Sequence, residues 1–277
     1  LPLPARGERV GVRGSYGTAM SDQLDSYLSL AVELADAAGA AIRPYFRTAL
    51  AVDDKADLSP VTAADRAAEA AMRRLVNARF PEHGIIGEEY GPEREDAEFV
   101  WVLDPIDGTK SFISGVPLFG TLIALARRGR SIVGIIDQPI SRERWIGAEG
   151  RATTHNGRVI HSRACPGIGA ATVFATTPDM FHGDDADAFA RVARAAKLVR
   201  FGADCYAYGL VAIGFADVVI EASLKPYDFG AMLPIIEGAG GVATDWQGQP
   251  LGLSSDGRVL IAGDKRTHSD ALDLLRG

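Results

Sequence analysis

Apolar residues recur along the N-terminal part of the chain at intervals of three and four residues, which is the period of an α-helix. This spacing predicts one helix that begins at Ser21 and ends near Pro44, and a second helix over residues 63–79. The residues that we expect on the inner face of the second helix are Ala67, Ala71, Leu75 and Val76.

Short runs rich in isoleucine, valine and leucine follow the second helix. The predicted strands are residues 85–86, 100–103, 118–126, 131–137 and 145–148. The third and fourth of these are spaced as a hairpin, and Asn156-Gly157 is typical of a tight turn between strands. Helices followed by antiparallel strands predict an α+β N-terminal half.

The second half of the chain alternates helices with strands. Its predicted helices are residues 186–197, 205–215, 229–237 and a last one that begins at Ser269. Its predicted strands are residues 199–201, 218–221, 242–244 and 259–262. We therefore expect an α/β fold with two sub-domains, residues 20–150 and 151–277, that pack together and share a cleft.

The first nineteen residues differ from the rest of the chain. They have neither a helical nor a strand period, and they lack the continuous apolar core of a secretion signal. We expect residues 1–19 to be a disordered leader or non-native sequence ahead of a start at Met20. A short transit peptide is the alternative.

The composition fits a globular protein with a sizeable core. Of 277 residues 47% are apolar, yet no run approaches the roughly eighteen apolar residues that span a bilayer. A net charge of −7 gives no basic surface for nucleic acid. Two cysteines, Cys165 and Cys205, make no disulfide framework, which favours a reducing compartment. We therefore expect a cytoplasmic protein that binds neither nucleic acid nor membranes.

Candidate chemistry concentrates where the strand 100–103 ends. Asp104, Ile106 and Asp107 offer two carboxylates and a backbone carbonyl, which are the oxygen ligands that Mg²⁺ prefers. Gly108 can adopt conformations closed to other residues, so that it and Thr109 can turn their amides toward an anion. The segment predicts a metal-and-phosphate site, although these residue types are also ordinary in turns.

Further carboxylates occur at the ends of other predicted elements. Glu88 follows the strand 85–86, Asp228 lies near the start of a helix, and Asp65 lies in the first turn of a helix that Thr62 caps. Capping explains Thr62, and the helix dipole favours Asp228, without any function. Neither explains why each acidic cluster falls at an element end, where a multi-metal site would need carboxylates.

In this order, the acidic motifs resemble those of the inositol monophosphatase superfamily of metal-dependent, lithium-sensitive phosphatases. The resemblance runs from Asp22 to Leu275. It rests on Asp57 with Val61-Thr62 and Asp65, on Gly87-Glu88-Glu89, on Asp104-Pro105-Ile106-Asp107-Gly108-Thr109, and on Asp228 with Glu237-Gly238-Ala239-Gly240-Gly241. It implies a layered αβαβα sandwich of the inositol monophosphatase type.

The resemblance also implies a site and a mechanism. A cage for two or three Mg²⁺ ions would consist of Glu88, Asp104, the Ile106 carbonyl, Asp107 and Asp228, with Asp65 near a further, weaker ion. The catalytic residues would be Asp65 and Thr109, which position and deprotonate a water, together with Glu88. The Gly108 and Thr109 amides would hold the phosphate of a small metabolite. Lithium should inhibit, and a homodimer is usual for such proteins.

Within the superfamily, the details look most like the histidinol-phosphate phosphatase branch. The supporting segments are residues 115–124, 200–208 and 224–229. Inositol-specific members usually have Trp where this chain has Tyr227, and the family often has Asn where this chain has Ser111. We therefore expect a phosphomonoesterase that hydrolyses histidinol phosphate to histidinol in histidine biosynthesis.

Histidinol phosphate carries an ammonium group and an imidazole, so carboxylates away from the metals should bind it. The candidates are Asp204, at an expected strand-to-helix turn, and Glu221, at the end of a strand; Arg200 and Asp228 are further expected substrate contacts. Asp204 as a helix cap and Glu221 as a solvated strand end are the alternatives. The alternative functions are an inositol-1-phosphate or 3′-phosphonucleotide phosphatase and a catalytically silent metabolite-binding regulator.

Overall fold

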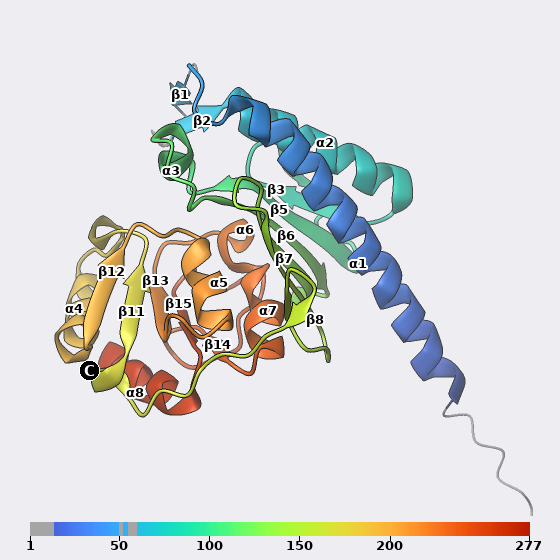
Figure 1. Cartoon of the computed structure of the whole chain (residues 1–277). Coiled ribbons are helices and arrows are strands. Elements are labelled where there is room, and N and C mark those ends of the chain that lie inside the picture. The colour runs from blue at the N-terminus through green and yellow to red at the C-terminus, as the bar shows by residue number, and fades with distance from the viewer. Residues whose placement is uncertain (1–13, 50–51, 55–59) are drawn as a thin grey trace, which may run out of the picture.

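The computed structural model describes residues 14–49, 52–54 and 60–277 (Figure 1). The described chain forms alternating layers of helices and sheets: an N-terminal helical layer, a sheet, a central helical layer, a second sheet and an outer helical layer. This arrangement confirms the αβαβα prediction. No described helix is long and apolar enough to cross a membrane.

The N-terminal half supplies the first helical layer and an eight-stranded sheet. The helices are α1 (Gly14–Ile42) and α2 (Ala63–Arg79), which are connected by η1 (Arg43–Tyr45), β1 (Val52–Asp54) and β2 (Pro60–Thr62). The large sheet contains β3 (Gly84–Gly87), β4 (Gly91–Glu93), β5 (Phe99–Asp107), β6 (Gly120–Arg127), β7 (Arg130–Gln138), β8 (Glu143–Ala148), β9 (Thr154–His155) and β10 (Arg158–Val159). Its order is β10-β9-β8-β7-β6-β5-β3-β4, and within the described strands of this sheet only the β3–β5 pair is parallel.

The second half supplies the other three layers. Its strands are β11 (Thr172–Ala175), β12 (Leu198–Phe201), β13 (Val218–Glu221), β14 (Val242–Thr244) and β15 (Val259–Ala262), in the order β12-β11-β13-β15-β14. The central helices are α5 (Tyr206–Ala212), α6 (Pro226–Phe229) and α7 (Met232–Gly238), and the outer helices are α4 (Asp184–Ala195) and α8 (Lys265–Arg276). Short helical turns occur at η2 (Ile168–Ala170) and η3 (Pro178–Met180) in this half, and at α3 (Thr109–Ile113) between β5 and β6 in the N-terminal half.

Both faces of each sheet are buried, which explains why the strands appear in the sequence as continuous apolar runs. In β5, Trp101 and Leu103 pack with the core under α1 and α2, whereas Val100 and Val102 pack with the core between the sheets. The second sheet divides its side chains in the same way between the central and outer helices. The end of β5 therefore emerges between two packed layers.

Two predicted helix starts are wrong. Helix α1 begins at Gly14, so residues 14–19 are helical rather than part of an irregular leader, because extending a formed helix fixes only one residue per hydrogen bond gained. Residues 1–13, like Asp57, lie outside the described residues. Helix α8 begins at Lys265 rather than Ser269, because Asp264 caps it by accepting a hydrogen bond from the Arg266 amide (2.9 Å).

The helix predicted over residues 229–237 is two short helices. Pro234 lies inside α7 and has no N–H to donate to the Gly230 carbonyl, so a continuous helix would lose a hydrogen bond there. The chain instead ends α6 at Phe229 and starts α7 at Met232. Strand β11, which the sequence did not predict, lies between β12 and β13 in the second sheet.

Candidate active site

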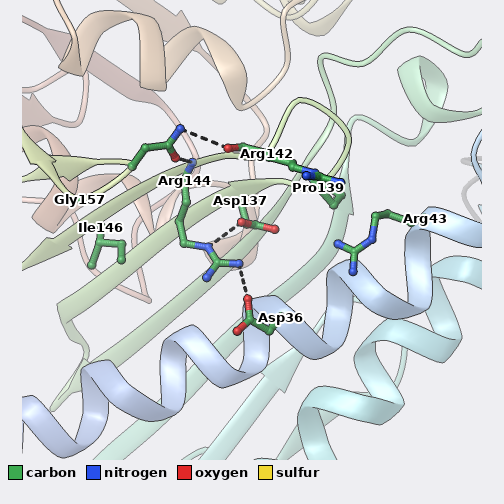
Figure 2. A pocket seen from close by; sticks show the side chains of 9 residues that line it. Asp36, Arg43, Asp137, Pro139, Arg142, Arg144, Ile146 and Gly157 are labelled. Carbon is green, nitrogen blue, oxygen red and sulfur yellow. Dashed lines mark hydrogen bonds and ion pairs between the residues drawn. The ribbon is translucent and has the colours of Figure 1, made fainter.

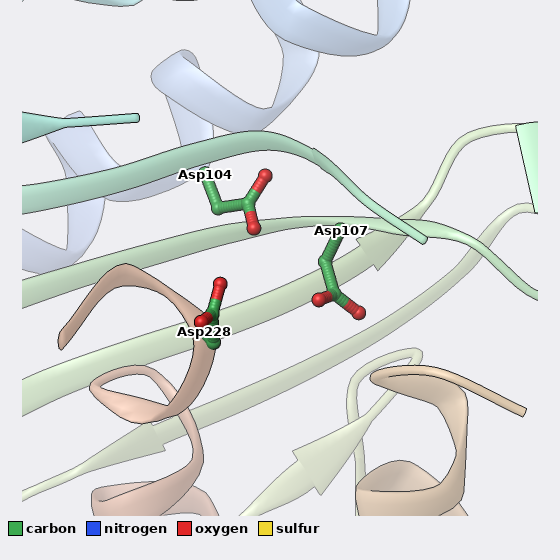
Figure 3. Close-up of side chains that lie close together, drawn as sticks. All are labelled: Asp104, Asp107 and Asp228. Carbon is green, nitrogen blue, oxygen red and sulfur yellow. The ribbon is translucent and has the colours of Figure 1, made fainter. Parts of the chain in front are cut away.

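Three aspartates from the two halves of the chain meet where β5 ends (Figure 3). Asp104 and Asp107 belong to β5, whose pairing with β6 is irregular between them, and Asp228 lies in the first turn of α6. One carboxylate oxygen from each lies within 4.8 Å of the others. The Lys225 amide donates to Asp228 Oδ2 (2.6 Å), which fixes that side chain from its own helix start.

The electrostatics of this cluster suit a cation. Burial, followed by the charges of neighbouring carboxylates, raises the pKa of Asp104 and of Asp107 well above the ordinary value. The same causes raise the pKa of Asp228 to about 7. Asp104 Oδ1 is buried and accepts no hydrogen bond from any described residue. Oxygen ligands at such spacing, one of them without a partner, fit a hard divalent cation.

Glu88 and Asp65 extend the acidic cluster. Glu88 follows β3, its amide donates to the Leu103 carbonyl (3.2 Å), and it lines the same pocket as Asp107 and Asp228. Asp65 accepts hydrogen bonds at Oδ2 from the Thr62 amide (2.9 Å) and hydroxyl (2.5 Å), so the predicted cap is present. Its Oδ1 is buried without a partner among the described residues. Capping therefore uses only one oxygen of Asp65.

Gly108 and Thr109 form the turn from β5 into α3. Gly108 has φ +84°, and a Cβ there would lie 2.7 Å from the Asp204 carboxylate carbon, so only glycine fits. The Thr109 hydroxyl donates to the Ile106 carbonyl (3.1 Å). Both Gly108 and Thr109 line the acidic pocket, as the sequence predicted for a phosphate-binding turn, and their role in binding phosphate stays a prediction.

The acidic pocket has a volume of about 310 Å³. It is lined by Glu88, Asp107, Gly108, Thr109, Lys110, Thr176, Met180, Asp204, Tyr208, Glu221, Leu224 and Asp228. Sequence reasoning missed five of these as site residues: Lys110, Thr176, Met180, Tyr208 and Leu224. Thr176 and Met180 follow the unpredicted strand β11. Tyr208 and Leu224 lie in the segments 200–208 and 224–229 that resemble the histidinol-phosphate phosphatase branch, but no role was expected for either side chain. Thr176 and Tyr208 both donate hydrogen bonds to Glu221, and these contacts are visible only in the folded structure.

Asp204 and Glu221 both line the pocket, and neither alternative for them holds. Asp204 does not cap α5; it has φ +44° and accepts a hydrogen bond from the Ser111 hydroxyl. Glu221 is 3% exposed rather than solvated. Its oxygens accept hydrogen bonds from the Thr176 amide (2.9 Å) and hydroxyl and from the Tyr208 hydroxyl. Ser111 thus supports Asp204.

Arg200 does not line the pocket. It is exposed on the edge strand β12, with its guanidinium carbon 6.0 Å from the centre of the Phe174 ring. The geometry gives no support to its expected contact with substrate. Lys110 is the only cationic residue among the described residues that line the pocket.

A second pocket of about 500 Å³ lies between α1 and the β7–β8 hairpin (Figure 2). Arg144 Nε donates to Asp137 (2.6 Å), and its Nη2 donates to Asp36 (2.8 Å). These ion pairs connect α1 to the sheet. None of the predicted site residues lines this pocket, so the candidate chemistry belongs to the acidic pocket.

Known proteins resemble this chain over most of its length. The profile of the inositol monophosphatase family matches residues 23–276. The bifunctional phosphatase IMPL2, chloroplastic, of Arabidopsis thaliana is 46% identical over 285 aligned positions, which cover 99% of this chain and 82% of that protein. The histidinol-phosphatase of Chlorobaculum parvum is 38% identical over 234 positions, which cover 84% and 90%.

A solved structure shows the same fold. An inositol monophosphatase from Zymomonas mobilis superposes with a TM-score of 0.84 and 46% sequence identity, over 96% of this chain and 100% of that chain.

Proposed function

The chain belongs to the inositol monophosphatase family and is a metal-dependent phosphatase, and from this premise we propose that it hydrolyses histidinol phosphate to histidinol and phosphate with Mg²⁺. The observation that carries this choice of substrate is Asp204. It is a buried carboxylate in the wall of the acidic pocket, and it is separate from the aspartates that would hold the cation.

The availability of Asp204 differs from that of Glu221. Asp204 Oδ2 accepts a hydrogen bond from Ser111, whereas its other oxygen accepts none from the described residues. Both oxygens of Glu221 are engaged by Thr176 and Tyr208. An ammonium or imidazolium group of the substrate would therefore bind Asp204 directly, and Glu221 would act by adding negative charge to the wall.

Different residues would bind the cations and activate the water. Asp104, Asp107, Asp228 and Glu88, with the Ile106 carbonyl, would hold the cations, and Asp65 would lie at a weaker position. When bound, Mg²⁺ neutralises phosphate charge and lowers the pKa of water. Asp65 Oδ1, which has no partner in the described residues, would take the proton of the attacking water that Thr109 helps to orient. In-line attack breaks the P–O ester bond, and the departing histidinol oxygen takes a proton from solvent.

The decisive experiment compares phosphate release from histidinol phosphate and from inositol 1-phosphate, side by side with Mg²⁺. We expect kcat/KM to be higher for histidinol phosphate. Asp204→Asn should lower it by about ten- to a hundredfold for that substrate, because a charge-assisted hydrogen bond of roughly 1.5–3 kcal/mol is lost. The same variant should leave kcat/KM for a phosphomonoester with an uncharged leaving group nearly unchanged.

A matched control is Asp179→Asn, which removes an exposed carboxylate beside Met180 that does not line the pocket. We expect this variant to change kcat/KM by less than twofold for both substrates. Equal losses on both substrates with Asp204→Asn would assign Asp204 to structure and remove the argument for histidinol phosphate.

Hydrolysis of inositol 1-phosphate is the second candidate. A solved structure with 46% identity, described as an inositol monophosphatase, favours it. The same pair of substrates separates the two functions, and a 3′-phosphonucleotide completes the panel. A homodimer and a cytoplasmic location remain predictions.

A further inference from the structure

Three charged residues of α2 are buried on one face of the helix. Asp65, Glu69 and Arg73 are spaced by four residues and are 0%, 0% and 7% exposed. Burying charged groups is unfavourable unless they are paired and hydrogen-bonded. The first belongs to the acidic cluster, whereas the other two have no part in the proposed chemistry.

Glu69 binds the turn that follows β3. Its Oε2 accepts a hydrogen bond from the Glu89 amide (2.7 Å), and its Oε1 accepts one from the Tyr90 amide (3.2 Å). A Cβ at Gly87 would overlap the same carboxylate, so Glu69 also lies directly against the residue before Glu88. One side chain thus contacts the backbone on both sides of Glu88.

Arg73 holds Glu69 in place. Its Nε donates to Glu69 Oε1 (2.7 Å), its Nη1 donates to Glu93 (2.7 Å), and its Nη2 donates to the Gly91 carbonyl. These bonds reach the far end of the β3–β4 turn. The backbone that carries Glu88 is therefore clamped by two buried side chains from a helix that contributes Asp65 one turn earlier.

We propose that Glu69, supported by Arg73, is a positioning residue that presents the Glu88 carboxylate to the cation. The proposal rests on the role of Glu88 given under the proposed function. Removing a residue that hydrogen-bonds and orients a metal ligand typically lowers metal affinity by about ten- to a hundredfold. A structural ion pair that only joins α2 to the sheet would lower stability and leave metal affinity unchanged.

The test measures Mg²⁺ binding by titration calorimetry on the metal-stripped, substrate-free protein, together with the unfolding temperature. Glu69→Gln should lower the affinity for Mg²⁺ by about ten- to a hundredfold. Excess Mg²⁺ should restore most of kcat, because no reacting group has been removed. The matched control is Glu93→Gln, which removes the other carboxylate on Arg73 but touches no amide beside Glu88; its affinity should stay within twofold of wild type.

Glu88→Gln is the reference for a lost ligand. If Glu88→Gln lowers the affinity for Mg²⁺ and a folded Glu69→Gln does not, the positioning role of Glu69 is wrong and the proposed function stands. If Glu88→Gln itself binds Mg²⁺ as the wild type does, both the ligand role and this inference are overturned.

Should Glu69→Gln fail to fold, Arg73→Lys tests the same clamp with the charge pair intact. A lysine cannot bind Glu69, Glu93 and the Gly91 carbonyl together. We expect this variant to lower the affinity for Mg²⁺ by about three- to tenfold. The loss should be smaller than with Glu69→Gln because the Glu69 carboxylate remains. Wild-type affinity in that variant would overturn the inference.

Discussion

Asp107→Asn should inactivate the enzyme and at the same time stabilise the metal-free protein. Asp107 is one of three aspartates whose carboxylate oxygens lie within 4.8 Å of one another, so that their charges repel when no cation is bound. Asparagine has nearly the same size, and its amide oxygen can still accept the hydrogen bond that the Cys205 amide donates to Asp107 (2.6 Å). The substitution therefore removes charge repulsion and a metal ligand while it keeps the packing.

The size of the effect can be worked out from the geometry. Two full charges 4.8 Å apart repel by about 3–4 kcal/mol at an effective dielectric constant of about 20. Because burial and neighbouring carboxylates raise the pKa values of Asp104 and Asp107, the cluster keeps some protons at neutral pH, and the repulsion relieved is smaller. We expect a gain of about 1–3 kcal/mol in the free energy of unfolding without metal. This corresponds to an increase in Tm of about 2–5 °C.

The gain should depend on pH in a defined direction. Burial first, and nearby carboxylates second, raise the pKa of Asp107 in the folded protein above its value in the unfolded chain. The folded, metal-free protein therefore binds more protons, and its stability falls as pH rises from about 4 through the raised pKa. Asp228, in the same cluster, has a pKa raised to about 7 and contributes in the same direction. The advantage of Asp107→Asn should therefore be small at about pH 5 and should grow as pH rises.

The assay is thermal unfolding of both proteins in EDTA and in Mg²⁺, with activity measured in parallel. In EDTA the variant should melt higher, and in Mg²⁺ the order should reverse, because only the wild type gains binding energy from the ion. Turnover should fall below about one per cent at saturating Mg²⁺, since a lost ligand raises the barrier by several kcal/mol. A variant less stable in EDTA, or one that keeps more activity, would refute the assignment.

Three further predictions concern ion binding and stability. Lithium should inhibit phosphate release if a weakly held ion lies near Asp65, and full activity in saturating lithium would count against such an ion. Arg144→Ala should lower the free energy of unfolding in urea by about 2–3 kcal/mol, because it leaves the buried Asp137 without its charge partner; a change below about 0.5 kcal/mol would contradict this. Burial opposes the ionisation of Asp217, but hydrogen bonds from Arg163 and a backbone amide outweigh it and lower its pKa. Asp217→Asn should therefore cost about 1–2 kcal/mol above pH 4. That difference should disappear as pH falls below the lowered pKa, and a difference constant down to about pH 2 would exclude the ion pair as its source.

Most of the fold was predictable because both sheets are buried on both faces. Strands such as β5 and β13 are apolar at successive positions, and the hairpin of β6 and β7 has a short polar turn. The failures have local causes that periodicity does not register. Pro234 divides a helix through one missing N–H, and four residues of β11 leave too short a pattern to separate from a loop.

The three clustered aspartates were predictable for a different reason. Asp107 ends β5, Asp104 lies three residues earlier, and Asp228 lies in the first turn of α6; the motifs around them are contiguous in sequence. The wall of the pocket is not contiguous: Thr176 and Tyr208 reach Glu221 from separate elements. Arg200 shows the converse, because it belongs to a segment that resembles a family motif and yet is exposed on an edge strand.

Helix α2 shows how a charge pattern can hide a functional face. Ala67, Ala71 and Leu75, three of the four residues expected on its inner face, are only partly buried, while Asp65, Glu69 and Arg73 are buried beside Ala64, Ala68, Met72 and Val76. Acids and an arginine spaced by four residues are normally taken as solvent-exposed pairs, because isolated helices gain little from burying them. Here the bonds from Thr62 to Asp65 and from the backbone around Glu88 to Glu69 compensate the burial. Those partners lie outside α2, so the hydropathy of α2 alone assigns the face of Asp65, Glu69 and Arg73 to solvent. In the fold, this face connects two parts of the acidic site.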